Sequence, residues 1–172
     1  MTFASWITLS RMILVIPTVW LLSTGHYGWA LCLILISALT DYLDGLAARK
    51  LNQISDVGKV LDQVADKIFV NSVIIVMAII GLIPSWFAVV TVGRDFLVNG
   101  FRTLCASKGV VVPADIWGKL KTVFQFILMI SVLLMPAHSW FVRTVLWFAL
   151  VLILFSGVSY IRKMVRIMEG IR

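Results

Sequence analysis

Apolar residues form six long runs along the chain, separated by short stretches that contain glycine, proline or charged residues. Runs of about 20 apolar residues have the length of a helix that crosses the hydrocarbon core of a bilayer. The pattern therefore predicts six transmembrane helices, which cover residues 11–23, 27–50, 57–80, 85–105, 116–135 and 140–161. Residues 2–10 precede them, and Phe3 and Trp6 predict that this segment lies at the membrane interface.

The composition agrees with this pattern. The 172 residues are 61% hydrophobic and have a mean hydropathy of +1.03, which is too apolar for a soluble domain. We expect an all-α integral membrane protein in which residues 1–172 form a single domain. Cys32 and Cys105 both fall in apolar runs, and we expect both to be small buried side chains without a disulfide.

The basic residues predict an orientation in the membrane. Lysine and arginine gather near residue 11 and at 49–59, 102–121 and 162–172, whereas the alternate loops hold only Arg143. Because positively charged loops stay in the cytosol, both termini are expected to be cytosolic. The net charge of +7 is then explained by this membrane face, with no nucleic-acid partner, and the basic tail is expected to contact anionic headgroups.

Five of the eight acidic residues of the chain lie between residues 41 and 66, and four of these five form two pairs. Asp41 and Asp44 are three residues apart, and Asp62 and Asp66 are four residues apart. On a helix, either spacing places the two side chains on one face. The two helices are joined by a short loop, so we expect them to pack antiparallel as neighbours and to direct all four carboxylates into one space.

These carboxylates are predicted to lie inside the membrane, near its cytosolic surface. Asp41 precedes Arg49 by eight residues, which is roughly 12 Å along a helix. Because clustered carboxylates repel one another, a hard divalent cation with oxygen ligands is the natural partner. An interhelical salt-bridge cluster with Arg49 and Lys67, which would only pin the helices, is the alternative.

Small residues beside these carboxylates indicate a place for a ligand. Gly45 and Ala48 clear side chains from one helix surface, which permits close approach of a ligand or of a neighbouring helix. Next to two carboxylates and Arg49, such a surface favours a flat or phosphorylated group. Gly58 could serve the same purpose or simply start its helix.

Taken together, these residues resemble the signature of the CDP-alcohol phosphatidyltransferase family. The matching pattern is Asp41-x2-Asp44-Gly45-x2-Ala48-Arg49-x8-Gly58-x3-Asp62-x3-Asp66. All eight fixed positions and all spacings agree. The resemblance implies transfer of a phosphatidyl group from CDP-diacylglycerol to an alcohol with release of CMP, a requirement for Mg²⁺ or Mn²⁺, and a homodimer. It further implies a bacterial cytoplasmic membrane, with the active site facing the cytosol.

The resemblance also assigns roles to the signature residues. The implied metal ligands are Asp41, Asp44, Asp62 and Asp66. Besides binding metal, Asp66 is expected to act as the base that takes the proton from the attacking hydroxyl. The residues implied for binding CDP-diacylglycerol are Asp41, Gly45, Ala48, Arg49 and Gly58.

Further matches resemble the family members that use glycerol 3-phosphate as the acceptor. The phosphate of that acceptor needs a basic pocket, for which the candidates are Arg94, Arg102, Lys119, Lys121, Thr8 and Arg11. Arg94 is the foremost, because an unpaired guanidinium in an apolar run is costly and the adjacent Asp95 is not expected to share its face. Lys119 and Lys121 could instead be plain interfacial lysines.

Other functions stay open at this point. The chain departs from the glycerol 3-phosphate-dependent members at Gln63, where proline is usual, and at Asp95, where glutamate is usual. Inositol phosphate, phosphatidylglycerol or serine could be the acceptor instead, although a basic pocket favours a phosphorylated one. A cation or proton transporter is a further alternative, but the outer halves of the second and third runs are mostly apolar beyond Asn71 and Ser72.

Overall fold

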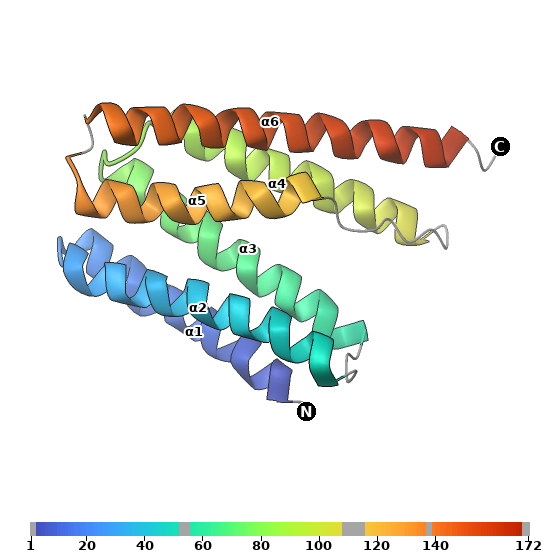
Figure 1. Ribbon diagram of the computed structural model, residues 1–172, viewed down its shortest axis with the longest axis horizontal. Helices are drawn as coiled ribbons and strands as arrows, with labels where there is room; N and C mark the ends of the chain where they lie inside the picture. The colour runs from blue at the N-terminus through green and yellow to red at the C-terminus, as the bar shows by residue number, and fades with distance from the viewer. Residues whose placement is uncertain (1–2, 52–55, 108–115, 137–138, 170–172) are drawn as a thin grey trace.

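The computed structural model is built of helices, with no strand among the described residues (Figure 1). It describes the backbone of residues 3–51, 56–107, 116–136 and 139–169, and the side chains of residues 10–40, 64–65, 67–105, 116–136 and 139–166. The helices are α1 (Phe3–Ser23), α2 (Tyr27–Leu51), α3 (Asp56–Ile79), α4 (Ser85–Ser107), α5 (Ile116–Leu134) and α6 (Trp140–Glu169).

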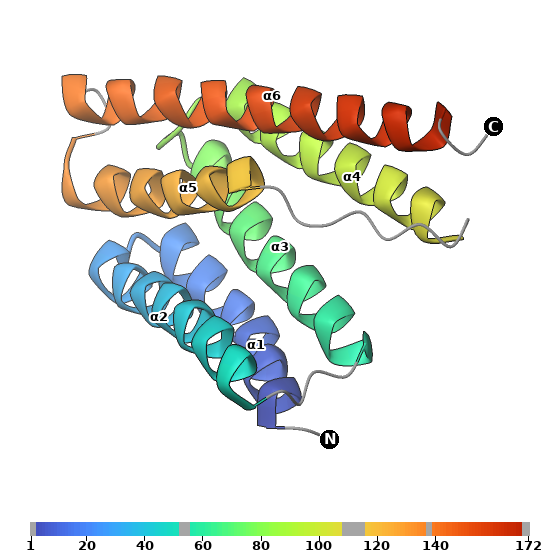
Figure 2. The ribbon, with the colours of Figure 1, turned by 45° about the vertical axis from the view of Figure 1, so that its right-hand side comes forward.

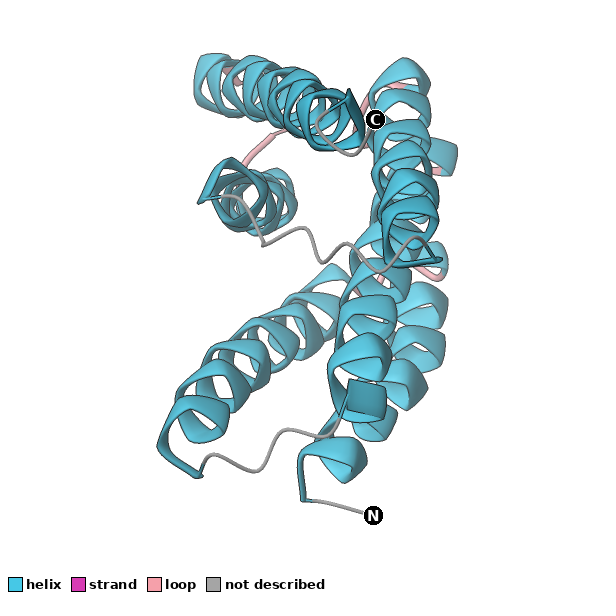
Figure 3. Cartoon of the chain, turned by 90° about the vertical axis from the view of Figure 1, so that its right-hand side faces the viewer, coloured by secondary structure: helices cyan, strands magenta, loops and turns pink. Residues whose placement is uncertain are grey.

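Successive helices run in opposite directions across the molecule. The beginnings of α1, α3 and α5 and the ends of α2, α4 and α6 lie on one side, as do both termini (Figure 2). The helices form two groups, α1 to α3 and α4 to α6, which are joined by packing of α3 against α4 and of α5 against α2 and α3 (Figure 3). The acidic signature, at the end of α2 and the start of α3, is therefore on the same side as the termini.

The six predicted segments are confirmed as helices, and most of their bounds agree within a few residues. Two of them extend further than predicted. Helix α1 begins at Phe3, so the segment expected at the membrane interface is continuous with the first apolar run, and α6 continues through the basic tail to Glu169. Backbone hydrogen bonds are internal to a helix, so a helix can continue past the point where its apolar residues end.

Length and composition identify two helices that could cross a membrane. Among the described residues these are Ile116–Leu134 and Trp140–Arg166. Shorter apolar helical segments cover Ser10–Ser23, Tyr27–Thr40 and Lys67–Ile79. Many of the large apolar side chains of α6 face outward, among them Trp147 and Phe148, which are 55% and 51% exposed. An apolar surface of this kind suits contact with lipid.

The packing of α2 and α3 differs from the expectation. Helix α1 packs against both α2 and α3, and the described residues show no comparable direct packing between α2 and α3 themselves. A short loop fixes the direction of the next helix but leaves room for a third helix beside the pair. The antiparallel course that we expected for α2 and α3 is visible in Figure 2.

Glycines with left-handed backbone conformation end α1 and α3. Gly25 and Gly81 both have a φ of 78°. The N–H of the residue after each glycine donates to a carbonyl five residues back, and the distance from Leu82 to Met77 is 2.9 Å. This Schellman arrangement reverses the chain at the side opposite the acidic signature.

The main core joins helices from both groups. Phe69 and Met77 of α3, Phe87 of α4, Leu128 of α5 and Ile153 of α6 are each at most 1% exposed. Through these side chains, the contacting faces of four helices are buried against one another. The positions of polar residues on the same helices are thereby fixed relative to one another.

A smaller cluster joins α4 to α6 through Val98, Cys105, Tyr160 and Met164. Cys105 is buried, as predicted. The prediction was wrong for Cys32, which is exposed. A thiol is nearly apolar, so on the outer surface of an apolar helix it needs no cover from other parts of the protein.

Candidate functional site

The residues of the acidic signature all lie on helices. Asp41, Asp44, Gly45, Ala48 and Arg49 are in α2, and Gly58, Asp62 and Asp66 are in α3. The helical backbone supports the premise that each aspartate pair shares one face. The side chains of these eight residues lie outside the described part of the structure, so their convergence, the metal ligands and the donor contacts stay predictions. The side chains that are described contain no group of three or more metal-binding residues.

A buried ion-pair network connects α4 with α5. Asp95 of α4 is 3% exposed and accepts hydrogen bonds from two cations. Arg94 donates from Nη1 to Asp95 Oδ1 at 3.0 Å, and Lys121 of α5 donates from Nζ to the same oxygen. Lys121 is itself only 4% exposed, so this carboxylate holds a buried ammonium in place.

The pair of Arg94 with Asp95 corrects one expectation. Neighbouring residues of a helix point about 100° apart, which is why we did not expect Arg94 and Asp95 to share a face. The guanidinium stands at the end of a long flexible stem, and this stem reaches around the helix to the short carboxylate. Arg94 is therefore paired on its own helix.

Arg94 also reaches α6. Its Nη2 donates to Ser156 Oγ at 2.9 Å, and Ser156 in turn donates to the carbonyl of Ile153 at 3.0 Å. Gly157 makes room for the arginine stem, because a Cβ added there would lie 3.3 Å from Arg94 Cγ. The Nε of Arg94 is buried and has no hydrogen-bond partner among the described residues. One donor of this guanidinium is thus left unsatisfied among the described residues.

Lys67 brings α3 into the same region. This lysine follows directly after Asp66, and it donates a hydrogen bond to Asn99 Oδ1 of α4. It lies within electrostatic range of Arg94, Arg102, Lys121 and Asp95. We call Lys67, Arg94, Arg102 and Lys121 the cationic cluster.

The other predicted acceptor residues are placed differently. Arg11 is fully buried in α1, at 1% exposure, while the side chain of Thr8 lies outside the described residues. Lys119 is exposed and makes no contact with the cationic cluster in the described part of the chain, as an interfacial lysine would. Of the six candidates, the structure therefore brings together Arg94, Arg102 and Lys121.

Sequence reasoning missed three members of this network. Lys67 was considered only as a counter-charge for the aspartates, and its contact with Asn99 joins residues 32 positions apart. Ser156 meets Arg94 across 62 positions. A serine in an apolar helix carries no signal of its partner, although a lysine next to the last signature aspartate could have been weighed as part of the site.

This arrangement favours anion binding. Arg94 and Lys121 contact Asp95, while Lys67 lies within electrostatic range of Asp95 and of Arg102. Among the described residues, the cluster therefore has an excess of positive charge. Hydrogen bonds from guanidinium and ammonium groups to phosphate oxygens are charge-assisted and strong. The cationic cluster is therefore suited to hold a phosphate group, with Asp95 reducing the repulsion between the cations.

Comparison with known proteins identifies the class of enzyme. The family model for CDP-alcohol phosphatidyltransferase matches residues 1–156. The chain therefore belongs to the CDP-alcohol phosphatidyltransferase family, and it is a membrane-associated phosphatidyltransferase.

Several individual members of this family are similar in sequence to the chain. The chain is 37% identical over 144 residues to the CDP-diacylglycerol–glycerol-3-phosphate 3-phosphatidyltransferase of Bacillus subtilis, covering 81% of this chain and 74% of the relative. It is 30% identical over 168 residues to the protein of the same name from Rickettsia typhi, covering 92% and 94%. A Mycobacterium bovis protein that is provisionally named a cardiolipin synthase is 32% identical over 124 residues, covering 71% and 59%.

Proposed function

We propose that this enzyme transfers the phosphatidyl group of CDP-diacylglycerol to glycerol 3-phosphate, giving phosphatidylglycerophosphate and CMP. The observation that carries the proposal is the cationic cluster, because glycerol 3-phosphate brings a dianionic phosphate that must be neutralised. The names of the Bacillus subtilis and Rickettsia typhi relatives support the same acceptor.

We also propose the arrangement in the membrane. All six helices cross the bacterial cytoplasmic membrane, both termini are cytosolic, and residues 1–172 form one domain. The alternating course of the helices and the gathering of lysine and arginine on the side of the termini support this orientation. The signature and the cationic cluster would then face the cytosol, where the soluble acceptor and CMP are found. A homodimer is proposed on the family resemblance alone.

The donor set of the signature fits a divalent cation. Asp41, Asp44, Asp62 and Asp66 offer hard carboxylate oxygens, and the helices that carry them end and begin on the same side of the molecule. We propose these four as ligands of Mg²⁺ or Mn²⁺. When bound, such an ion neutralises charge on the diphosphate of CDP-diacylglycerol as CMP departs.

Residues of the chain itself would hold the donor. Gly45 and Ala48 leave a helix surface without bulky side chains, so the cytidine group can approach the backbone of α2 closely. Gly58 would line the same slot from α3. Arg49 would hold the diphosphate by charge-assisted hydrogen bonds.

The acceptor would be held by the cationic cluster and activated by the signature. Arg94 has a buried Nε without a partner among the described residues, and this donor is suited to a phosphate oxygen. Lys67 immediately follows Asp66, so an acceptor phosphate at the cluster would keep its free hydroxyl near the last aspartate. We propose that Asp66 takes the proton of this hydroxyl while the hydroxyl oxygen bonds to the phosphatidyl phosphorus and the bond between that phosphorus and CMP breaks.

A second acceptor is favoured by one observation. The Mycobacterium bovis relative carries a cardiolipin synthase name, and such an enzyme would use phosphatidylglycerol as the alcohol. Phosphatidylglycerol carries a phosphodiester with one charge, which needs fewer cations than the described cluster offers.

An acceptor panel tests the proposed function. Purified protein is incubated with CDP-diacylglycerol, Mg²⁺ and one of glycerol 3-phosphate, inositol phosphate, phosphatidylglycerol or serine, and release of CMP is measured. We expect release that depends on glycerol 3-phosphate. If CMP were released only in the presence of phosphatidylglycerol, phosphatidylglycerol would be the acceptor in place of glycerol 3-phosphate. If none of the four acceptors promoted CMP release, the proposal would be overturned.

A further inference from the structure

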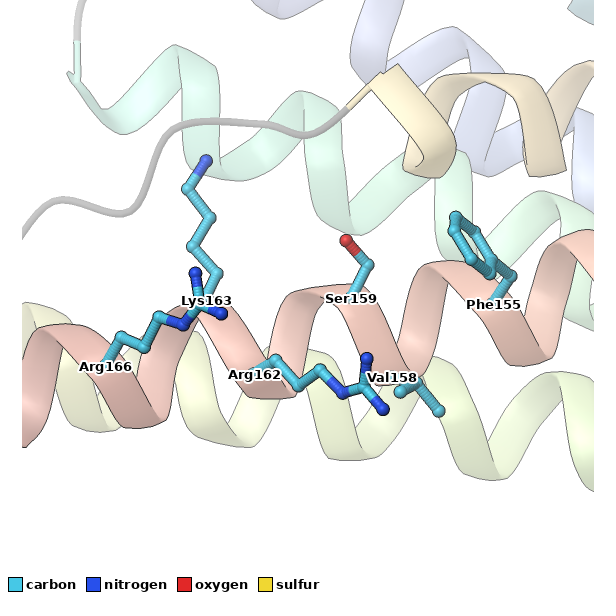
Figure 4. Close-up of a pocket in the computed structure, with 6 residues that line it drawn as sticks. All are labelled: Phe155, Val158, Ser159, Arg162, Lys163 and Arg166. Carbon is cyan, nitrogen blue, oxygen red and sulfur yellow. The ribbon is translucent and has the colours of Figure 1, made fainter.

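One stretch of α6 combines apolar and cationic side chains around a surface pocket. The pocket has a volume of about 540 Å³ and is lined by Phe155, Val158, Ser159, Arg162, Lys163 and Arg166 (Figure 4). Successive lining residues are one or three positions apart, which places them on one side of the helix. We call these six residues the α6 stripe.

The α6 stripe changes polarity in one direction. Phe155 and Val158, at its first end, are apolar and about half exposed, at 50% and 48%. Ser159 follows with a hydroxyl, and the cations Arg162, Lys163 and Arg166 stand toward the end of the helix (Figure 4). No ion pair with a carboxylate is seen for these three cations among the described residues.

The stripe is separate from the cationic cluster. Helix α6 meets Arg94 through Ser156 and Gly157, both of which are buried. Arg162 and Arg166 are exposed instead. The stripe therefore opens outward, and its cations are not required to hold Arg94 or Asp95.

The surroundings of the stripe indicate a membrane interface. Trp140–Arg166 is long and apolar enough to cross a membrane, and the stripe occupies the last part of that segment. Trp117, at the start of α5, contacts Phe155 edge-to-face with ring centroids 4.7 Å apart. Tryptophan is common at headgroup level, and arginine and lysine extend from helix ends into the headgroup region.

We propose that the α6 stripe binds one anionic glycerophospholipid. Its phosphate lies against Arg162, Lys163 and Arg166, its ester region lies near Ser159, and one acyl chain lies along Phe155 and Val158. From Phe155 to Arg166 the helix rises roughly 16 Å, which matches a span from the headgroup into the upper acyl chain. A zwitterionic lipid fits less well, because its own ammonium group is repelled by the three cations.

Binding of lipid to the full-length protein tests this site. The purified protein is titrated with dioleoyl phosphatidylglycerol or dioleoyl phosphatidylcholine, and bound lipid is counted by native mass spectrometry. We expect phosphatidylglycerol to bind more tightly. Arg162→Gln and Arg166→Gln should each weaken its binding about fivefold, as expected for loss of one cation near the membrane surface.

Matched variants separate the site from general charge. Arg143→Gln removes an exposed arginine at the other end of the same helix and should leave binding unchanged. Phe155→Ala should weaken binding of the lipid, while the soluble headgroup glycerophosphoglycerol should compete poorly. Equal binding of the two lipids, or equal losses in the Arg143 and Arg162 variants, would overturn the proposal. Displacement of phosphatidylglycerol by saturating CDP-diacylglycerol would assign the stripe to the donor instead.

Discussion

Asp95 of α4 and Lys121 of α5 form a buried ion pair between two helices that are consecutive in the chain but run in opposite directions. Both side chains are at most 5% exposed, and the same carboxylate oxygen accepts a hydrogen bond from Arg94 at 3.0 Å. A single aspartate thus positions two of the cations that we propose for the acceptor phosphate.

Asp95→Asn should damage both stability and acceptor binding. Removal of one partner of a buried ion pair leaves an uncompensated charge and costs about 3–5 kcal/mol. We expect a lower thermal unfolding midpoint in detergent and a higher KM for glycerol 3-phosphate. Asp95→Glu, which keeps the charge, should retain most of both properties. An Asp95→Asn enzyme with unchanged stability and unchanged acceptor KM would show that the pair has no positioning role.

Gly157→Ala tests the close approach of Arg94 to α6. The added Cβ would meet Arg94 Cγ at 3.3 Å, so the arginine stem must shift by a few tenths of an ångström. We expect a KM for glycerol 3-phosphate that is raised severalfold, with the KM for CDP-diacylglycerol unchanged. The control is Gly100→Ala on α4, where nothing lies within 4 Å of the new Cβ. There the substitution should stabilise the helix by up to about 1 kcal/mol and leave both KM values alone.

Asp66→Asn should remove the proposed base. Loss of general base catalysis lowers turnover by roughly 100- to 10,000-fold, and we expect binding of CDP-diacylglycerol to persist. The matched control is Asp56→Asn, which changes an aspartate at the start of α3 outside the signature and should keep turnover near the original rate. Turnover of Asp66→Asn at the original rate would exclude Asp66 as the base.

Removal of divalent metal should abolish turnover. We expect a chelator to stop CMP release and added Mg²⁺ or Mn²⁺ to restore it. Binding of Mn²⁺, followed by electron paramagnetic resonance, should weaken in Asp41→Asn and Asp62→Asn but not in Asp95→Asn, because Asp95 is engaged by Arg94 and Lys121. Full activity in a preparation shown by elemental analysis to lack divalent metal would contradict the assignment of the signature.

The hydropathy pattern alone predicted all six helices that the structure describes. The six apolar runs gave the helix bounds closely, because membrane-length apolar runs and glycine breaks are local features of the sequence. The end of α6 was missed because the apolar run stops at Ile161 whereas the helix continues. The packing of α1 between α2 and α3, and the exposure of Cys32, depend on how helices are arranged in space, which no local pattern encodes.

The candidate site was predicted in part for the same reason. Arg94 was found because a charged residue in an apolar run is conspicuous, and Lys121 because the acceptor phosphate needs basic residues. Their partners were not found, since the contacts of Lys67 with Asn99 and of Arg94 with Ser156 bridge different helices. The joint role of Asp95 was missed because adjacent helix positions point apart, and only the length of the arginine side chain overcomes this separation.

Recognition of the acceptor phosphate by the cationic cluster is tested most directly by comparing glycerol 3-phosphate with glycerol as acceptors. The measurement is the ratio of their kcat/KM values in the original enzyme, in Arg94→Ala and in Lys119→Gln, a control lysine that is exposed and outside the cluster. We predict a strong preference for glycerol 3-phosphate that falls roughly 10- to 150-fold in Arg94→Ala, as expected for loss of hydrogen bonds to a charged group, and stays intact in Lys119→Gln. An Arg94→Ala enzyme that folds normally and keeps the full preference would contradict the account.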